Sequence, residues 1–467
     1  MAGIIVSGCG QETKLSTSSM KARRAYHEGV SLFEKFYFNE AMDAFRQSLA
    51  ADSALAMAWA RLAILDFTSE NESGARDHVE KALLYSGNAT RREQLFIRMW
   101  NHYIRFSRDK AMAVVDSLIR EYPDEAEAYV FRGRLYEHEK SLEEAIRSYE
   151  RALEIDTAYA PAAMSLGYAY SQAGEQEKAL VHMERYIRLD PGSADPRASY
   201  ADLLLYVGEY TAALDQYKRS LEVKPDYWYA HTKIGEIYTV YGRLREAEEE
   251  LTQGKMGLPF SKIREATIVA EQAHLNTMRG RYTEAIRQFE AAFNVDSMNV
   301  SAAYGVVHAL TKLEKFKEAD RAVQRIRTEL ERRNLTSSRA MLGFYLMKAR
   351  LFIEQDRLSE ARAACDTALD FTTALTRGAV YKELAEIGLR EKSFETAFDA
   401  CEEALGTNPN NPEALLTLTK LYHATGDERM TQEIGGRLLA LWSNADPDFE
   451  KLAELRRLVG PGRSPVL

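Results

Sequence analysis

The feature that most constrains this chain is a recurrence of small and large residues at a spacing of 34. Alanine recurs at this spacing, and a larger residue follows it four positions later: Ala145, Ala179, Ala213 and Ala247, followed by Tyr149, Met183, Tyr217 and Leu251. Further upstream a small residue recurs in the same phase, with a large one three positions later: Gly133, Gly167, Ala201 and Gly235, followed by Tyr136, Tyr170, Leu204 and Tyr238. A fixed period of about 20 to 50 residues indicates stacked structural repeats.

Each repeat reads as two amphipathic helices joined by a short turn. Apolar residues recur at i, i+3 or i+4, and i+7 in both halves, and glycines such as Gly174 and Gly208 stand between the halves. We expect the small residues at the Gly133 and Ala145 phases to let the two helices approach closely. The large residues at the Tyr149 phase should fill the space between neighbouring pairs, since one pair cannot bury its apolar face alone.

Prolines close three of these units at one phase, at Pro191, Pro225 and Pro259. Together the positions resemble the tetratricopeptide repeat, whose pattern is W-x2-L-G-x2-Y, then A-x3-F, then P. The resemblance implies an all-α fold, an α-solenoid that winds as a right-handed superhelix. Extending the phase in both directions gives about twelve helix pairs, which begin near Ala22, Ala56, Arg92, Ala126, Ala160, Ala194, Trp228, Ala266, Val300, Leu342, Gly378 and Pro412.

The repeat pattern divides the chain into segments. We expect a leader with a polar tether at 1–21, an N-terminal array at 22–326, an irregular insertion at 327–341, a C-terminal array at 342–445, and a capping helix with a tail at 446–467. The capping helix should run from Asp448 to Leu458. The 34-residue spacing is interrupted near Gly257–Phe260 and again over the insertion. Each break is explained either by longer connecting helices and loops or by a hinge between two lobes.

The leader contains Val6-Ser7-Gly8-Cys9, which resembles a bacterial lipobox. Small residues before the cysteine give a signal peptidase access to the bond, and the thiol of Cys9 accepts the diacylglycerol. A secretory signal has a basic start and roughly 7 to 15 apolar residues, whereas only Met1–Ile5 precede this segment, without a charged side chain. The leader is therefore either the end of a lipoprotein signal, with Cys9 lipidated, or a disordered cytosolic N-terminus.

Composition and motifs argue against several functional classes. The net charge of -9 argues against nucleic-acid binding. Without a window of about 20 apolar residues, membrane attachment would run only through a lipid on Cys9. The histidines and cysteines form no metal-binding spacing, and the chain has no phosphate loop and no G-x-S-x-G turn. We therefore expect no catalytic residue, metal or cofactor, and we expect Cys365 and Cys401 to be buried, unlinked thiols.

A partner-binding surface follows from the resemblance. In the tetratricopeptide family, the second, fifth, ninth and twelfth positions of each repeat line a concave groove. Carried onto this chain, with Tyr206 one position beyond, this implies a groove made of Arg134, Glu137, Met164, Tyr168, Asp202, Tyr206, Tyr229 and Glu236. The lysine-and-asparagine set with which chaperone-binding members hold a C-terminal carboxylate is absent at these positions. Tyrosine mixed with arginine and glutamate favours an extended or helical peptide, and the alternative is an ordinary solvated surface.

These features predict a non-enzymatic scaffold that binds proteins or peptides. With the lipobox-like segment, the prediction becomes a lipid-anchored protein of the bacterial cell envelope. The alternative is a cytosolic adaptor or a sensor module that uses the same repeats in the cytoplasm. A third class, an enzyme whose site is assembled from several repeats, would be marked by a metal-binding or phosphate-binding cluster in the folded chain.

Overall fold

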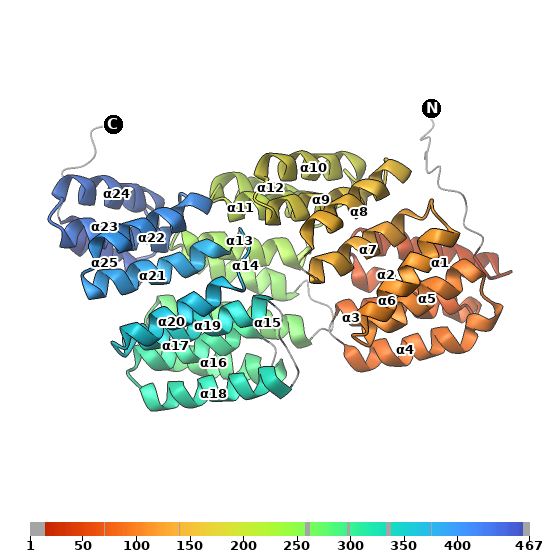
Figure 1. Ribbon diagram of the computed structural model, residues 1–467, viewed down its shortest axis with the longest axis horizontal. Helices are drawn as coiled ribbons and strands as arrows, with labels where there is room; N and C mark the ends of the chain where they lie inside the picture. The colour runs from red at the N-terminus through yellow and green to blue at the C-terminus, as the bar shows by residue number, and fades with distance from the viewer. Residues whose placement is uncertain are drawn as a thin grey trace. The chain divides into compact units, whose positions relative to one another are not determined.

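The computed structural model describes residues 15–460, except 70, 140, 257–261, 297–298, 333–337 and 375. Over these residues the chain forms 25 α-helices and one short 3-10 helix, η1 (Ser86–Asn88), and no strand (Figure 1). The α-helices are α1 (Met20–Glu34), α2 (Phe38–Ala51), α3 (Ala56–Thr68), α4 (Glu72–Tyr85), α5 (Arg91–Ile104), α6 (Arg108–Glu121), α7 (Ala126–His138), α8 (Leu142–Ile155), α9 (Ala160–Gln172), α10 (Gln176–Leu189), α11 (Asp195–Tyr206), α12 (Tyr210–Val223), α13 (Trp228–Val240), α14 (Leu244–Met256), α15 (Lys262–Met278), α16 (Tyr282–Val295), α17 (Val300–Lys312), α18 (Phe316–Arg332), α19 (Ser338–Glu354), α20 (Leu358–Leu369), α21 (Arg377–Glu391), α22 (Phe394–Thr407), α23 (Pro412–Ala424), α24 (Glu428–Leu441) and α25 (Glu450–Val459).

Helices α1 to α24 form twelve consecutive pairs, and α25 follows them. Six of the predicted starts coincide with the first residue of a helix, and the other six lie within four residues of one. The prediction of an all-α array of about twelve tetratricopeptide-like helix pairs is therefore confirmed, while the handedness of a superhelix stays a prediction. Repeat positions are counted below from each predicted start, so that Ala126 is position 1 of its pair.

The described residues fall into two compact units. The first holds the chain up to residue 170 together with 175–196, and the second holds 171–174 together with the chain from 197 onward. The insertion expected at 327–341 lies inside the second unit, where 327–332 belong to the end of α18 and 338–341 to the start of α19. Each of these helices has 17 residues. These long helices agree with the first explanation of the break, and a hinge role stays a prediction. Residues 257–260 and 333–337 lie outside the described part.

In several pairs a glycine at position 8 of the first helix faces a large residue at position 24 of the second. A Cβ added to Gly133 would lie 2.3 Å from Cε1 of Tyr149, and one added to Gly167 would lie 2.7 Å from the terminal methyl carbon of Met183. Tyr149 and Met183 are both fully buried. The glycine thus opens a space inside its own pair, which the large side chain fills. We had expected that side chain to fill the space between neighbouring pairs.

The turn inside each pair uses one residue with a positive φ, and it stands at repeat position 15 wherever that position is described. These ten residues are Phe36, Phe106, Gly174, Gly208, Gly242, Gly280, Glu314, Asp356, Lys392 and Gly426. Glycine reaches this conformation without strain, whereas a residue with a Cβ adopts it at a cost. Five pairs therefore form the same turn with a residue other than glycine at position 15.

Inside the second unit, the C-terminal pairs pack onto the turns of its first pairs. The side chain of Asn410, in the loop before α23, donates to the carbonyl of Gly208 at 3.2 Å. The backbone N–H of Asp446, which follows α24, donates to the carbonyl of Gly242 at 2.9 Å. Tyr282, at the start of α16, donates its hydroxyl to Glu450 of α25 at 2.9 Å. Three successive turns, α11–α12, α13–α14 and α15–α16, thus hold the end of the same unit.

Helix α25 also completes the last pair. Position 24 of that pair is Gly435, which has no side chain to fill the core. A Cβ at Gly435 would lie 2.4 Å from a methyl carbon of Val459, the last residue of α25. Val459 and Leu455 are buried. Helix α25 therefore supplies from outside the pair the apolar volume that a large side chain at position 24 provides in pairs such as the fourth, and its role as a cap stays a prediction.

We expect Gly133→Ala to destabilise the chain by about 1–3 kcal/mol, because the new methyl group would overlap the rigid ring of Tyr149. Gly167→Ala is the matched control, since the flexible thioether of Met183 can move away from the added carbon. Urea unfolding followed by circular dichroism measures both. Equal midpoints for the two variants would contradict the assigned contact.

Candidate functional site

The eight predicted groove residues lie on first helices of four successive pairs. Those of the first unit are Arg134 and Glu137 on α7, and Met164 and Tyr168 on α9, and all four are half-buried. Burial raises the pKa of Glu137, and nearby Arg134 opposes that shift. The surface of the first unit thus carries a thioether, a phenol and a pair of opposite charges, each with part of its area open to solvent.

A buried ion pair fixes α7 of the first unit against α3. Both terminal nitrogens of Arg61 donate to Glu127, at 2.8 Å and 3.0 Å. Arg61 is 6% exposed and its guanidinium lies over the ring of Phe96. Burial alone would raise the pKa of the Glu127 carboxyl, but Arg61 holds it below its ordinary value. A bidentate pair in this geometry sets the position of α7, the helix that carries Arg134 and Glu137.

In the second unit, two predicted residues, Asp202 and Tyr229, meet at the buried carboxylate of Asp202. Asp202 of α11 is 7% exposed and accepts a hydrogen bond from Tyr217 of α12 at 2.6 Å. It also accepts from the hydroxyl of Tyr229 on α13, at 2.9 Å and 3.0 Å. Burial, and next the charge of Asp202, raise the pKa of Tyr217 and Tyr229 well above 10. Asp202 therefore holds Tyr229 in place from beneath the surface. Tyr206, one turn further along α11, is 47% exposed.

The remaining predicted residue, Glu236, pairs with Lys233, which the sequence analysis did not predict to belong to the site. Glu236 on α13 accepts a hydrogen bond from Lys233 at 2.7 Å, and the Lys233 ammonium lies 5.9 Å from the centre of the Tyr229 ring. Burial opposes it, but Glu236 and Tyr229 raise the pKa of Lys233 above its ordinary value, so the lysine is charged at neutral pH. We call Tyr206, Tyr229, Lys233 and Glu236 the α11–α13 surface.

A second group of charges, also missed, lies on α19, α21, α23 and α25 of the second unit. Arg350 donates to Glu383 at 2.6 Å, and Lys382 lies 3.1 Å from the same carboxylate. Lys382 and Lys451 both donate to Glu413. These two lysines hold the pKa of Glu413 well below its usual range. Three cations here surround two carboxylates, so this group keeps a positive balance inside an acidic protein.

The signal that could have found this group was present in the sequence. Glu413, Lys382 and Arg350 occupy positions 2, 5 and 9 of their repeats, which are the groove positions of the family. The predicted groove was confined to the central repeats, where the resemblance is strongest. Lys451 stands in the capping helix, where no repeat position applies.

Other predicted features concern chemistry and attachment. Cys365 and Cys401 are free and buried, as predicted, and burial raises the pKa of each thiol to about 12. In the part of the chain that the structure describes, no group of three or more His, Cys, Asp or Glu residues could hold a metal ion. None of the described helices has the length and apolarity needed to cross a lipid bilayer. Cys9 lies outside the described residues.

Comparisons with known proteins match segments of this chain. A family model described as tetratricopeptide repeat matches residues 108–160, 201–254 and 346–412, and another of the same description matches 160–193. Over 107 residues the chain is 35% identical to superkiller complex protein 3 of Mus musculus, covering 22% of this chain and 6% of that protein. Over 212 residues it is 22% identical to the DnaJ homolog subfamily C member 7 homolog of Schizosaccharomyces pombe, covering 42% of each. The chain thus spans less than half the length of these relatives.

A solved structure is also similar in part. The crystal structure of MamA matches with a TM-score of 0.30 and 23% identity, over 34% of this chain and 93% of that one. The helix pairs first define the class, an all-α repeat protein built by stacking. The matched segments contain tetratricopeptide repeats, and the helix pairs on either side of them continue the same architecture.

We expect Asp202→Ala to destabilise the second unit by about 1–3 kcal/mol, because it leaves the buried hydroxyl of Tyr217 without an acceptor. Tyr217→Phe removes that hydroxyl, so the double variant should lose less stability than the sum of the two single losses. Urea unfolding of the four proteins gives the cycle, with Tyr206→Phe as a surface control of small effect. Strict additivity would show that the two groups are not coupled.

Proposed function

We propose that this chain is an interaction scaffold that binds a peptide segment of a partner protein on its first helices. Members of the tetratricopeptide repeat family bind proteins, and this supports the general role. The observation that carries the specific proposal is the α11–α13 surface. There, exposed Tyr206 lies close to Tyr229, a tyrosine that Asp202 holds rigid. A tyrosine fixed in advance gives contact area at little further entropy cost.

The charges of this surface suggest what the peptide carries. Lys233 and Glu236 stand next to each other on α13, with 26% and 49% of their side chains exposed. A partner segment with one acidic and one basic group could pair with both, while an apolar or aromatic residue packs on the tyrosines. Because surface pairs contribute little energy each, the tyrosines would supply most of the affinity and the charges the register.

A photo-crosslinking residue in place of Tyr206 should capture the partner in the cells from which the chain comes. The matched control carries the same residue in place of Val223, which is 38% exposed on the second helix α12. Gel electrophoresis and mass spectrometry should find one protein crosslinked at position 206, and less of it when Lys233→Glu and Glu236→Lys reverse the adjacent charges. The same crosslinked species at both positions would argue against a specific surface here.

We further propose that the scaffold is a lipid-anchored protein of the bacterial cell envelope. The support for this is the segment Val6-Ser7-Gly8-Cys9, which resembles a lipobox. Acyl chains on Cys9 would contribute about 0.8 kcal/mol per buried CH₂ to membrane attachment. The alternative is a cytosolic adaptor or sensor, in which the same surface would bind its partner without an anchor.

Metabolic labelling with a fatty-acid analogue separates these alternatives. We expect label on the wild-type protein and its recovery with membranes, and neither for Cys9→Ser, which lacks the acceptor thiol. The full gene should be used, with any upstream in-frame codons. Absence of label on the wild type, or equal label on both proteins, would favour the cytosolic alternative.

A further inference from the structure

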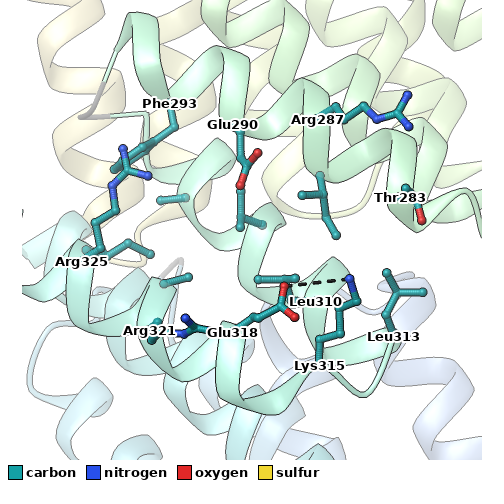
Figure 2. A pocket seen from close by; sticks show the side chains of 15 residues that line it. Thr283, Arg287, Glu290, Phe293, Leu310, Leu313, Lys315, Glu318, Arg321 and Arg325 are labelled. Atoms are coloured by element: carbon teal, nitrogen blue, oxygen red, sulfur yellow. Dashed lines mark ion pairs between the residues drawn. The ribbon is translucent and has the colours of Figure 1, made fainter.

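A groove of about 500 Å³ opens between α16 and α18 in the second unit, over α17 (Figure 2). Each helix contributes one face at helical spacing. The lining residues are Thr283, Ile286, Arg287, Glu290 and Phe293 from α16, Ala303, Val306, Leu310 and Leu313 from α17 and its turn, and Lys315, Glu318, Arg321, Ala322, Arg325 and Ile326 from α18 and the residue before it. The floor is apolar and the rim is charged, which is the form of a site for an amphipathic segment.

A comparison with three other pairs shows which side chains can occupy the equivalent space. In the second, fifth and eighth pairs, the side chains at positions 11 and 23 meet across the pair. Asp66 and His78 lie 2.5 Å apart in the second pair, and Asn276 donates to Gln288 at 2.8 Å in the eighth. The ninth pair has Leu310 and Ala322 at these positions, and both line the groove.

The fifth pair shows what would fill the space. There position 11 is Tyr170, whose ring stacks on His182 at position 23 with ring centres 5.4 Å apart. Its hydroxyl donates to Glu150 of the preceding pair at 2.7 Å. The residue equivalent to Glu150 beside the groove is Glu290, at position 25 of the eighth pair. The groove therefore has the equivalent acceptor, Glu290, but no equivalent of Tyr170 or of the His182 imidazole on which the tyrosine ring stacks.

Glu290 is exposed and no partner for its carboxylate lies among the described residues. Arg321 and Arg325 stand one turn apart on α18, and neither has a carboxylate partner among those residues. Arg325 lies over the ring of Phe293 instead, 4.7 Å from its centre. Figure 2 shows Glu290 on one side of the groove and the two arginines on the other. Arg321 donates to the carbonyl of Lys317, and Arg325 donates to the side-chain oxygen of Asn294. The groove thus offers one acceptor on the α16 side and, on the α18 side, two cations without a carboxylate partner.

We infer that this groove binds an amphipathic helix of a partner protein, which inserts a tyrosine where Tyr170 lies in the fifth pair. The tyrosine ring would pack on Leu310 and Ala322, and its hydroxyl would donate to Glu290. Acidic residues one turn before and after the tyrosine would pair with Arg321 and Arg325. Aromatic anchors of this kind dominate the affinity of helix-in-groove complexes.

This site is separate from the α11–α13 surface, because it is formed by α16, α17 and α18. Its occupant differs too, since the groove selects a tyrosine with acidic neighbours. The two sites could hold two segments of one partner or two different partners. Either proposal can fail without the other.

The test uses the full-length protein and a synthetic 15-residue alanine-based helix with one central tyrosine and glutamates four positions before and three after it. Fluorescence anisotropy gives the Kd, and methyl NMR of isoleucine reports Ile286 and Ile326 in the groove. Control peptides replace the tyrosine by phenylalanine or the glutamates by lysines. Tyr206→Ala serves as the variant of the other surface.

We expect the peptide to bind and to shift the methyl signals of Ile286 and Ile326. Phenylalanine should raise the Kd about tenfold, the effect of losing one hydrogen bond to a charged group, and this difference should vanish in Glu290→Gln. Leu310→Tyr with Ala322→His introduces the contact of the fifth pair, so it should fill the groove, keep the thermal stability and weaken binding at least about tenfold.

Arg321→Glu with Arg325→Glu should also weaken binding, and should reverse the preference in favour of the lysine peptide. The matched control is Arg185→Glu, which changes the position equivalent to Arg325 in α10, where Tyr170 fills the slot. All three arginines are charged surface residues, so we expect their variants to fold. They therefore test the proposal even if the variant that carries Leu310→Tyr with Ala322→His does not fold. Unchanged affinity in the filled or the charge-reversed variant, or no methyl shifts at millimolar peptide, would overturn the proposal.

Discussion

The stacking of this chain depends on the contact between repeat positions 8 and 24 inside each pair. Where position 8 is a glycine, as at Gly133, the large residue at position 24 lies directly over the backbone of the first helix. A buried side chain of this size removes a large apolar area from water in the pairs that have one. The remaining features of the repeats, such as the turn at position 15, orient the second helix so that this contact forms. The last pair has a glycine at position 24 in place of a large residue. There, Val459 of α25 occupies the space beside Gly435.

Much of the fold could be predicted because its main contacts are local and periodic. The alanine and tyrosine phases placed all twelve pairs, and the starts at Ala56 and Pro412 coincide with helix starts near both ends. The site could be predicted less well. The groove positions of the repeat family predicted Tyr229 and Glu236. The burial of Asp202 could not be predicted in this way, because it depends on tyrosines from two other helices. The groove over Leu310 could not be predicted from the sequence, because the contact that fills the equivalent space in the fifth pair, Tyr170 with His182, became visible only in the structure.

Two buried polar contacts carry the surfaces that we propose to be functional. Arg61 pairs with Glu127 beneath the first unit's helix α7, and Asp202 accepts hydrogen bonds from two tyrosines beneath α13. Buried ionic groups add little net stability compared with apolar residues of the same volume. Their directional bonds instead restrict how neighbouring first helices rotate within each unit. Half-buried Glu137 in the first unit and exposed Tyr206 in the second therefore each keep a fixed place on their own unit.

The closure of the second unit limits how the number of repeats can change. In an open array each repeat touches only its neighbours, so insertion or loss of 34 residues leaves every remaining interface intact. Here Asn410, Asp446 and Glu450 each meet a different turn, at Gly208, Gly242 and near Gly280. One additional pair between α15 and α22 would move the chain end away from all three turns at once. Internal duplication and deletion, the usual ways in which repeat proteins change length, are therefore constrained in this unit, and its copy number is part of its tertiary structure.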